Sequence, residues 1–137
     1  VCTDAHEAKR VLSQMKIVIR TNYSNPPTHG AALVETVLGD DELRAQWVTE
    51  LGEMRDRIKS MRTALVDGLR AAGVEGMDYI TDQVGMFSFS GLTKDQMVRL
   101  RNEFGVYGTD TGRICVAALN PDNVGYVSEA IAAVKKG

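Results

Sequence analysis

A run of apolar residues that recurs every three or four positions between Asp40 and Ala72 constrains this chain more than any other feature. The spacing predicts one long helix with a single apolar face. Its 33 residues would extend roughly 50 Å, whereas a compact domain of this chain length has a radius of gyration of only about 14 Å. We therefore expect the helix to bridge two bodies, with Gly52 as its weakest point. The apolar positions are Leu43, Trp47, Leu51, Met54, Ile58, Met61, Leu65 and Leu69.

The composition is that of an ordinary soluble chain. It has 137 residues, of which 44% are hydrophobic and 25% charged, and this length suits a single domain. A formal charge of −2 provides no basic field for nucleic acid or anionic lipid, and no apolar run approaches the roughly 20 residues that span a bilayer. We expect a cytoplasmic protein with neither a nucleic-acid nor a membrane partner.

The cysteines and histidines predict neither a disulfide framework nor a metal site. Cys2 and Cys115 stand far apart without a CxxC pair, and His6 and His29 are the only histidines. We expect two reduced thiols and no bound metal. The segment from Val1 resembles the end of a strand that runs into a helix, so we expect this chain to begin within a longer protein.

Two helices are expected before the long one. Asp4 is suited to cap the first, with Glu7 reaching back to the cap, and Pro26 and Pro27 end it soon after Thr21. The second should run from about residue 28 to Gly39, which is typical of a helix end. The remainder predicts an α+β region in which Phe87 and Phe89 share one face of a strand. We expect strands at 78–80, 86–90, 106–109 and 114–117, and helices from the caps Thr93 and Asn120.

Two arginines are candidate carboxylate ligands. Arg113 follows a Thr-Gly turn and opens a strand, where a fixed guanidinium could donate two parallel bonds to a carboxylate. The alternative is an ordinary surface arginine in solvent. Arg20 lies at a helix end, and there the alternative is an arginine that neutralises its own helix C-terminus. The six lysines fall on polar helix faces, so none of them is expected to form a Schiff base.

Three stretches together resemble the aspartate/aromatic aminotransferases, which are class I, fold-type-I pyridoxal-phosphate enzymes. The first is Asn22-Tyr-Ser-Asn-Pro-Pro-Thr-His-Gly-Ala, and the second is Gly85-Met-Phe-Ser-Phe-Ser-Gly-Leu-Thr. The third is Glu103-Phe-Gly-Val-Tyr followed by Gly112-Arg-Ile-Cys-Val-Ala. The resemblance covers about Asp4 to Val134, in the family's order, and corresponds to the C-terminal third of such an enzyme.

The resemblance implies a role for each matching residue. Arg113 matches the arginine that binds the α-carboxylate of every substrate, and Phe87 matches a ring that lines the substrate cleft. Arg20 matches the arginine that reaches the partner subunit's site in a homodimer and binds the side-chain carboxylate of dicarboxylic substrates. Ser24 and Asn25 match the interface loop beside the partner's cofactor phosphate.

The same resemblance implies a division of the chain. Residues 1–39 would be the end of the large cofactor-binding domain, 40–72 the bridging helix, and 73–137 the small α+β domain. One of the bridged bodies would then be absent, so the first half of the helix should be less well covered than the second. Ala118 stands where relatives often have Gly, and Thr21 occupies a variable position, which leaves the aspartate-versus-aromatic preference open.

The family's catalytic groups have no counterpart in this sequence. Its Schiff-base lysine, phosphate loop, pyridinium-pairing aspartate and ring-oxygen tyrosine lie upstream of the matching region. We therefore expect no catalytic residue here and no pyridoxal phosphate bound by this piece, which would depend on the remainder of its polypeptide. The parent enzyme would exchange an amino group between an L-amino acid and 2-oxoglutarate as a homodimer. The alternative is a stand-alone, non-catalytic ligand-binding or dimerisation module derived from the same fold.

Overall fold

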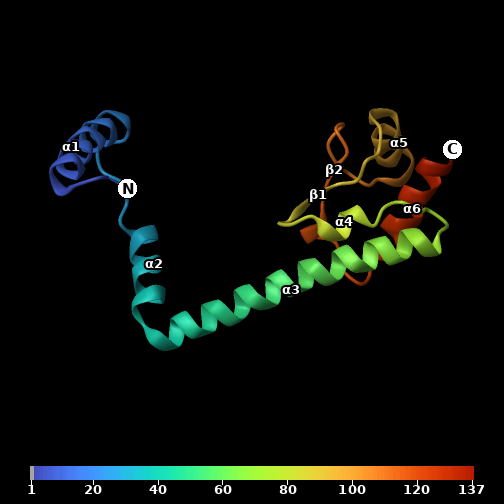
Figure 1. Ribbon diagram of the computed structural model, residues 1–137, viewed down its shortest axis with the longest axis horizontal. Coiled ribbons are helices and arrows are strands. Elements are labelled where there is room, and N and C mark those ends of the chain that lie inside the picture. The colour runs from blue at the N-terminus through green and yellow to red at the C-terminus, as the bar shows by residue number, and fades with distance from the viewer. Residues whose placement is uncertain (1) are drawn as a thin grey trace. The chain divides into compact units, whose positions relative to one another are not determined.

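The computed structural model describes residues 2–137 as a mostly helical chain with one small sheet (Figure 1). In chain order its elements are α1 (Ala5–Asn22), α2 (His29–Gly39), α3 (Asp41–Ala71), α4 (Tyr79–Asp82), β1 (Phe87–Phe89), α5 (Lys94–Phe104), β2 (Arg113–Cys115), the 3₁₀ helix η1 (Val116–Ala118) and α6 (Val124–Lys136).

The long helix is confirmed. α3 has 31 residues and is helical throughout, including Gly52. The chain divides into two compact units, Val1–Trp47 and Val48–Gly137, and the boundary falls inside this helix. As expected, the apolar face of the first half of this helix is less buried than that of the second half. Leu43, Trp47 and Leu51 are exposed. Leu65 and Leu69 are fully buried.

The first unit contains α1, α2 and the start of α3. Asp4 caps α1 as predicted, because its Oδ1 accepts the Glu7 N–H at 2.8 Å. The predicted return contact differs: Glu7 Oε2 accepts the backbone N–H of Thr3 at 2.7 Å, not that of the cap residue. The carboxylate reaches past the cap to the N–H and hydroxyl of Thr3, two donors on one residue. No described residue from 2 to 47 is buried.

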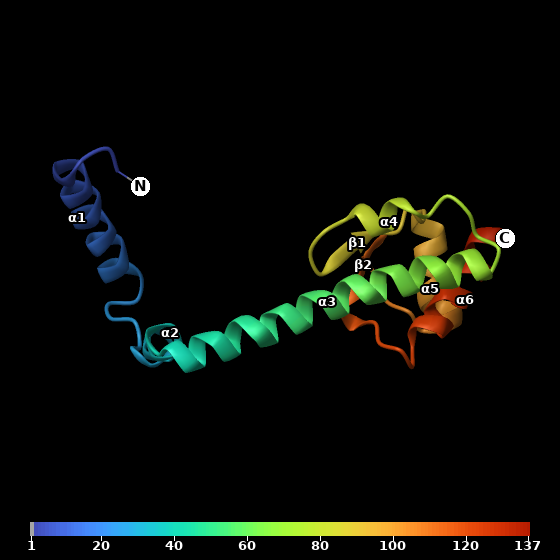
Figure 2. The same ribbon diagram turned by 60° about the horizontal axis from the view of Figure 1, so that its bottom comes forward.

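The second unit has a continuous hydrophobic core. Figure 2 shows α4, the sheet, α5 and α6 gathered along the later half of α3. The buried apolar residues of this core are Met61, Leu65, Val66, Leu69, Val74, Met77, Ile80, Leu92, Met97, Leu100, Ile114, Val116, Leu119, Ile131, Ala132 and Val134. The capping box on α5 is confirmed, with Thr93 accepting the Gln96 N–H and Gln96 returning to the Thr93 N–H at 2.9 Å.

The sheet has two antiparallel strands, and its register pairs Phe87 with Cys115 and Phe89 with Arg113. The two phenylalanines share a face as predicted, but that face is exposed, while Ser88 points into the unit and is 1% exposed. A strand buries alternate residues. Here the buried face carries serine because a polar group from α3 occupies the space behind it, as described below.

Four predicted elements differ from the structure. The strand predicted at 114–117 stops at Cys115, the last residue of β2, because Val116 and Ala117 belong to the 3₁₀ helix η1. Residues 78–80 do not form a strand, since Tyr79–Asp82 is the short helix α4. Residues 106–109 do not form one either, because β2 pairs with β1 and the Val106 N–H instead donates to the Leu100 carbonyl at 3.2 Å, closing the end of α5. Asn120 caps a turn whose Asp122 N–H donates to Oδ1 at 2.9 Å, so α6 begins only at Val124.

Two absences apply to the part of the chain that the structure describes. Within residues 2–137, no helix combines the length and apolar character needed to cross a membrane. The same residues contain no group of three or more acidic, histidine or cysteine side chains arranged to hold a metal ion.

Candidate functional site

The exposed face of the sheet carries an arginine stacked on an aromatic ring. Arg113 lies opposite Phe89 in the register, so Phe87 is its diagonal neighbour on the same face. Diagonal neighbours in an antiparallel pair are within reach of long side chains. The central guanidinium carbon of Arg113 lies 4.9 Å from the centroid of the Phe87 ring. The sequence therefore places these two candidates on different strands, and the structure brings them together.

The guanidinium of Arg113 keeps its hydrogen-bonding capacity. Among the residues from 2 to 137, it donates no hydrogen bond and forms no ion pair, and its one side-chain interaction is with the Phe87 ring. An arginine over an aromatic face gains about 0.5–1 kcal/mol at an exposed site. That contact uses the flat face of the guanidinium and leaves its edge donors free. Arg113 is therefore held by its face and free at its edge, as the bidentate binding of a carboxylate requires.

The backbone of Arg113 is fixed by the turn that precedes it. Its N–H donates to Thr109 Oγ1 at 3.1 Å, and the Thr109 N–H donates to the Arg113 carbonyl at 3.0 Å. Gly112 has φ +87°, and a Cβ there would lie 2.9 Å from the Leu92 carbonyl oxygen. Only glycine fits such a conformation and such a contact. The carbonyl of Gly112 accepts the Ser90 N–H at 2.9 Å, which joins the turn to the end of β1.

Two arginines on α3, which the motifs in the sequence did not indicate, hold the segment after β2 and the inner side of β1. Arg57 donates to the carbonyls of Leu119 at 2.8 Å and Ala117 at 2.9 Å. Arg62 is buried and donates to the Ser88 hydroxyl at 3.1 Å. The available signal was that Arg62 falls on the apolar face of α3, four residues after Ile58, where a solvated arginine would not be placed.

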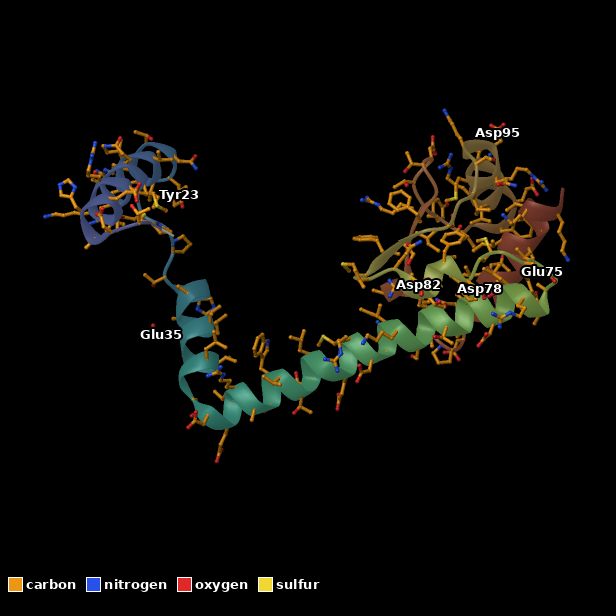
Figure 3. The ribbon with its side chains drawn as sticks, in the orientation of Figure 1. Tyr23, Glu35, Glu75, Asp78, Asp82 and Asp95 are labelled. Carbon is orange, nitrogen blue, oxygen red and sulfur yellow. The ribbon has the colours of Figure 1, made fainter. Side chains whose placement is uncertain are left out.

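The second candidate cluster lies at the end of α1, in the other unit. An Nη1 atom of Arg20 donates to the Ser24 hydroxyl, so the structure brings these two predicted residues together. Ser24 has φ +64°, which is uncommon for a residue with a side chain, and its N–H donates to the Ile19 carbonyl at 3.2 Å. The Asn25 N–H donates to the carbonyl of Tyr23, the residue labelled at this end of α1 in Figure 3.

The conformation of this loop follows from its local sequence. A left-handed residue just beyond a helix closes the last open carbonyls. Ser24 adopts it with the hydroxyl turned back to Arg20, and Pro26 then prevents the helix from continuing. Arg20 and Ser24 are exposed, so their contact leaves the remaining guanidinium donors available. Arg20 and Arg113 belong to different units, and each cluster stands by itself.

The lysines of this chain do not fit attachment of a pyridoxal group. All six are exposed, whereas a lysine that forms a Schiff base is activated by desolvation or by a neighbouring cation. Lys136 donates to the Ala72 carbonyl, and Lys94 lies 4.0 Å from Asp110. Within residues 2–137, every lysine is exposed and none has the desolvated surroundings that formation of a Schiff base requires.

Comparison with known sequences gives a consistent result. Residues 1–131 match the family described as aminotransferase class I and II. The chain is 59% identical over 129 residues to an aspartate aminotransferase of Pseudomonas aeruginosa, and the aligned part covers 93% of this chain and 32% of that protein.

Solved structures agree with the sequence relatives. An aromatic-amino-acid aminotransferase from Burkholderia pseudomallei, covalently bound to pyridoxal phosphate, superposes with a TM-score of 0.95 at 62% identity over 98% of this chain and 34% of that one. An aromatic aminotransferase from Psychrobacter sp. B6, cocrystallised with aspartic acid, gives 0.95 at 47% identity over 100% of this chain and 35% of that one. The chain thus spans about a third of the length of the relatives it matches.

Proposed function

The chain belongs to the class I and II aminotransferases, and we propose that it is the C-terminal third of a cytoplasmic, homodimeric aspartate/aromatic aminotransferase. The complete enzyme would move an amino group between an L-amino acid and 2-oxoglutarate in a ping-pong reaction. Aspartate and aromatic amino acids are the donors that the relatives' names suggest. This part of the enzyme would supply recognition of the substrate carboxylates and contacts between subunits.

The observation that carries the proposal is the free guanidinium edge of Arg113. An amino acid and its keto acid share one group, the α-carboxylate, and a planar fork of N–H donors matches that group in two parallel bonds. The Phe87 ring holds the flat face of the guanidinium, and the turn fixes its backbone. Arg113 would therefore hold the α-carboxylate of every substrate in one orientation, with Phe87 lining the cleft.

The Arg20 cluster would serve a narrower purpose. The contact between Arg20 and the hydroxyl of Ser24 holds a cation at the end of α1, and Asn25 follows at once. In the proposed dimer these residues would reach the partner subunit's site. There, Arg20 would bind the side-chain carboxylate of acidic substrates, and Ser24 and Asn25 would lie beside the cofactor phosphate.

The proposed domain division is the one that the family resemblance implies. Residues 1–39 would end the large domain, 40–72 would bridge, and 73–137 would form the small domain. The exposed apolar side chains in the first half of α3 support this division, because large apolar surfaces in soluble proteins are normally covered by a partner.

Pyridoxal phosphate, when bound, supplies the electron sink for transamination. Its lysine and its pyridinium partner would come from the remainder of the polypeptide, since the six lysines here are exposed. What this chain contributes is orientation, because a substrate gripped by its carboxylates presents its amino group and α-proton in a fixed direction.

Substitution of the two arginines in the full-length enzyme tests the proposal. Arg113→Ala should lower kcat/KM for aspartate and for phenylalanine alike, because each substrate loses a bidentate charged contact. The lost transition-state stabilisation should be about 3–5 kcal/mol for both. Arg20→Ala should lower it for aspartate and leave phenylalanine nearly unchanged. Arg99→Ala, on the exposed surface of α5, is the matched control and should alter neither. Equal loss for both substrates in Arg20→Ala would contradict the division of roles.

Hybrid dimers test whether Arg20 acts across the subunit boundary. One subunit carries Arg20→Ala and keeps the cofactor lysine, while the other keeps Arg20 and lacks that lysine. Only a site formed by both chains would then be intact. Aspartate turnover should return to about half of the wild-type value per dimer if the two sites are independent. No recovery, despite verified subunit exchange, would place Arg20 at its own chain's site.

A stand-alone module is the second candidate, and one observation favours it. Val48–Gly137 has a continuous core of its own, so this unit has the packing needed to persist without the remainder of an enzyme. The intact mass of the protein isolated from its cells separates the two. A mass near 15.0 kDa supports the module, and one about three times larger supports the enzyme.

A further inference from the structure

The most unusual charge in the second unit is Arg62. Its side chain is 4% exposed, and in the described part of the chain no carboxylate pairs with it. A buried charge without compensation is costly. Arg62 is compensated by neutral acceptors, all of which belong to β1 or to the residue pair before it. It also lines a groove beside α3, whose far side includes Asp82, labelled in Figure 3.

The contacts of Arg62 follow the strand along its buried side. Nη2 donates to the Gly85 carbonyl at 2.6 Å and, more weakly, to the Phe87 carbonyl at 3.4 Å. Nε donates to the Ser88 hydroxyl at 3.1 Å. Successive residues of a strand face opposite sides, so the guanidinium that fixes Ser88 on the inner face also fixes the direction of the Phe87 ring on the outer face.

We propose that Arg62 is a positioning residue for substrate recognition, which acts on Arg113 through β1 and the Phe87 ring. The inference rests on the proposed role of Arg113 as the carboxylate ligand. The chain of contacts is continuous: Arg62 to the Phe87 backbone and Ser88, and the Phe87 ring to the Arg113 guanidinium at 4.9 Å. Arg62 itself touches no substrate.

A strand this short needs such an anchor. β1 and β2 have three residues each and form a two-stranded sheet, which backbone bonds extend from Val116 to Met86 and from Ser90 to Gly112. A two-stranded ladder this short is only marginally stable by itself and gives limited resistance to rotation of β1. Besides Arg62, the amide of Gln83 holds this strand by exchanging two hydrogen bonds with Phe89 at 3.1 and 2.7 Å. The Tyr79 hydroxyl also donates to the carbonyl of Ser90, just after β1, at 2.8 Å. Arg57 supplies a comparable anchor for the segment after β2.

The geometry also explains why the anchor is an arginine. A guanidinium has donors on three nitrogens in one plane, and here two of them serve three acceptors, two on β1 and one on Gly85 just before it. A lysine has one compact ammonium and cannot span these acceptors. An apolar residue of similar length fills the space but leaves the buried hydroxyl of Ser88 without this donor.

The test uses the full-length holoenzyme with Arg62→Lys and Arg62→Met. The matched control is Arg55→Met, since Arg55 lies on the same helix and, among the described residues, its side chain forms an ion pair with the exposed Asp56 and no hydrogen bond to β1. Misplacement of the carboxylate ligand should lower kcat/KM by up to about 100-fold, with KM and the Kd of a dicarboxylate inhibitor both raised. The control should match the wild type. Arg62→Lys should recover little of the loss.

A double-mutant cycle with Phe87→Ala separates positioning from a general structural defect. If Arg62 acts through the ring, removing the ring makes the second substitution nearly silent, and the two losses do not add. Additive losses would overturn the inference. So would a lower kcat at unchanged KM and unchanged inhibitor Kd, since that indicates only a smaller active fraction.

The outcome is distinguishable from failure of the proposed function. If the wild-type enzyme does not transaminate, the proposed function fails, but the positioning relation can still be read from crystal structures. The Arg62→Met structure should then show the Phe87 ring displaced from the Arg113 guanidinium relative to wild type. An unchanged stack would refute the positioning role independently of activity.

Discussion

The two units of this chain carry apolar residues in similar helical patterns but cover them very differently. In Val1–Trp47, Val18 lies on α1 with 63% of its surface exposed, and none of the described residues is buried. In Val48–Gly137, Ile131 lies on α6 and is 1% exposed. Periodicity predicts a helix and its apolar face equally well in both. What covers that face depends on residues far along the chain.

Helix α3 has one half of each kind: its apolar face is exposed in the first half and buried in the second. Its first half shows Trp47 at 46% exposure, while its second half buries Leu65 completely. Most of the stability of a helix in a protein comes from packing rather than from its own propensity. The second unit should therefore carry nearly all the cooperative stability of this chain, and the first should gain its stability from another surface.

Core truncation gives the largest expected contrast. Ile131→Ala should lower the free energy of unfolding of the chain by about 2–5 kcal/mol, because it opens a cavity in the packed unit. Val18→Ala, on exposed α1, should change it by no more than about 0.5 kcal/mol. Urea denaturation followed by circular dichroism measures both. A comparable loss at Val18 would mean that the first unit is covered in solution, for example by a second copy.

Two glycines should respond with opposite sign. Gly112→Ala should destabilise by about 1–3 kcal/mol, because it forces a side chain into a left-handed conformation and against the Leu92 carbonyl. Gly30→Ala lies in α2, where a Cβ meets nothing within 4 Å, and should raise local helicity. Thermal unfolding reports the first and far-ultraviolet circular dichroism the second. A neutral Gly112→Ala would show that the turn before Arg113 is not rigid.

Helix caps should sharpen the contrast at a smaller scale. Thr93→Ala removes the capping box of α5 and should lower the free energy of unfolding by about 1 kcal/mol. Asp4→Ala removes the equivalent acceptor on α1, and should reduce helix content without shifting the main unfolding transition. Hydrogen exchange distinguishes the two, since loss of protection after Asp4→Ala should stay within α1.

Acid should produce the smallest effect. The hydrogen bond from Arg99 lowers the pKa of Glu103 below its ordinary value of 4.5, so the pair's contribution is present above that pH and is lost as pH falls below it. Both groups are exposed, so the effect should be slight and further reduced by salt. Stability from pH 7 to 3 in wild type and Glu103→Gln measures it, and an undiminished difference in molar salt would contradict it.

Glu7 provides the counterpart in the first unit. The hydrogen bonds from Thr3 lower the pKa of its carboxyl, so its titration has the same sign. Because α1 is not part of the packed unit, acid should alter its helix content and leave the main unfolding transition unchanged.

Local signals predicted much of this architecture. The long helix, the cap at Asp4 and the cap at Thr93 depend on neighbouring residues, and the structure contains all three. The predicted strand at 78–80 failed because Asp78 starts a helical turn whose Ile80 is needed in the core. The burial of Ile80 depends on residues far away in the sequence, and a pattern over a few positions carries no information about them.

In the candidate site, too, the local sequence identifies residues, whereas their contacts depend on distant parts of the chain. Arg113 and Phe87 could be named from motifs, but their stacking depends on the register between two strands. The roles of Arg57 and Arg62 depend on carbonyls 60 or more and about 25 residues away in sequence. Position on the apolar face of α3 indicates that Arg62 is buried, but nothing local identifies its acceptors.

The central claim is that the free edge of Arg113 binds the α-carboxylate of the substrate. The most direct test is a crystal structure of the full-length enzyme with a bound dicarboxylate. We expect one carboxylate held by two parallel hydrogen bonds from Arg113, at about 2.7–2.9 Å, with the Phe87 ring still beneath the guanidinium. A dicarboxylate bound elsewhere, with Arg113 paired to a protein carboxylate or left in solvent, would contradict it.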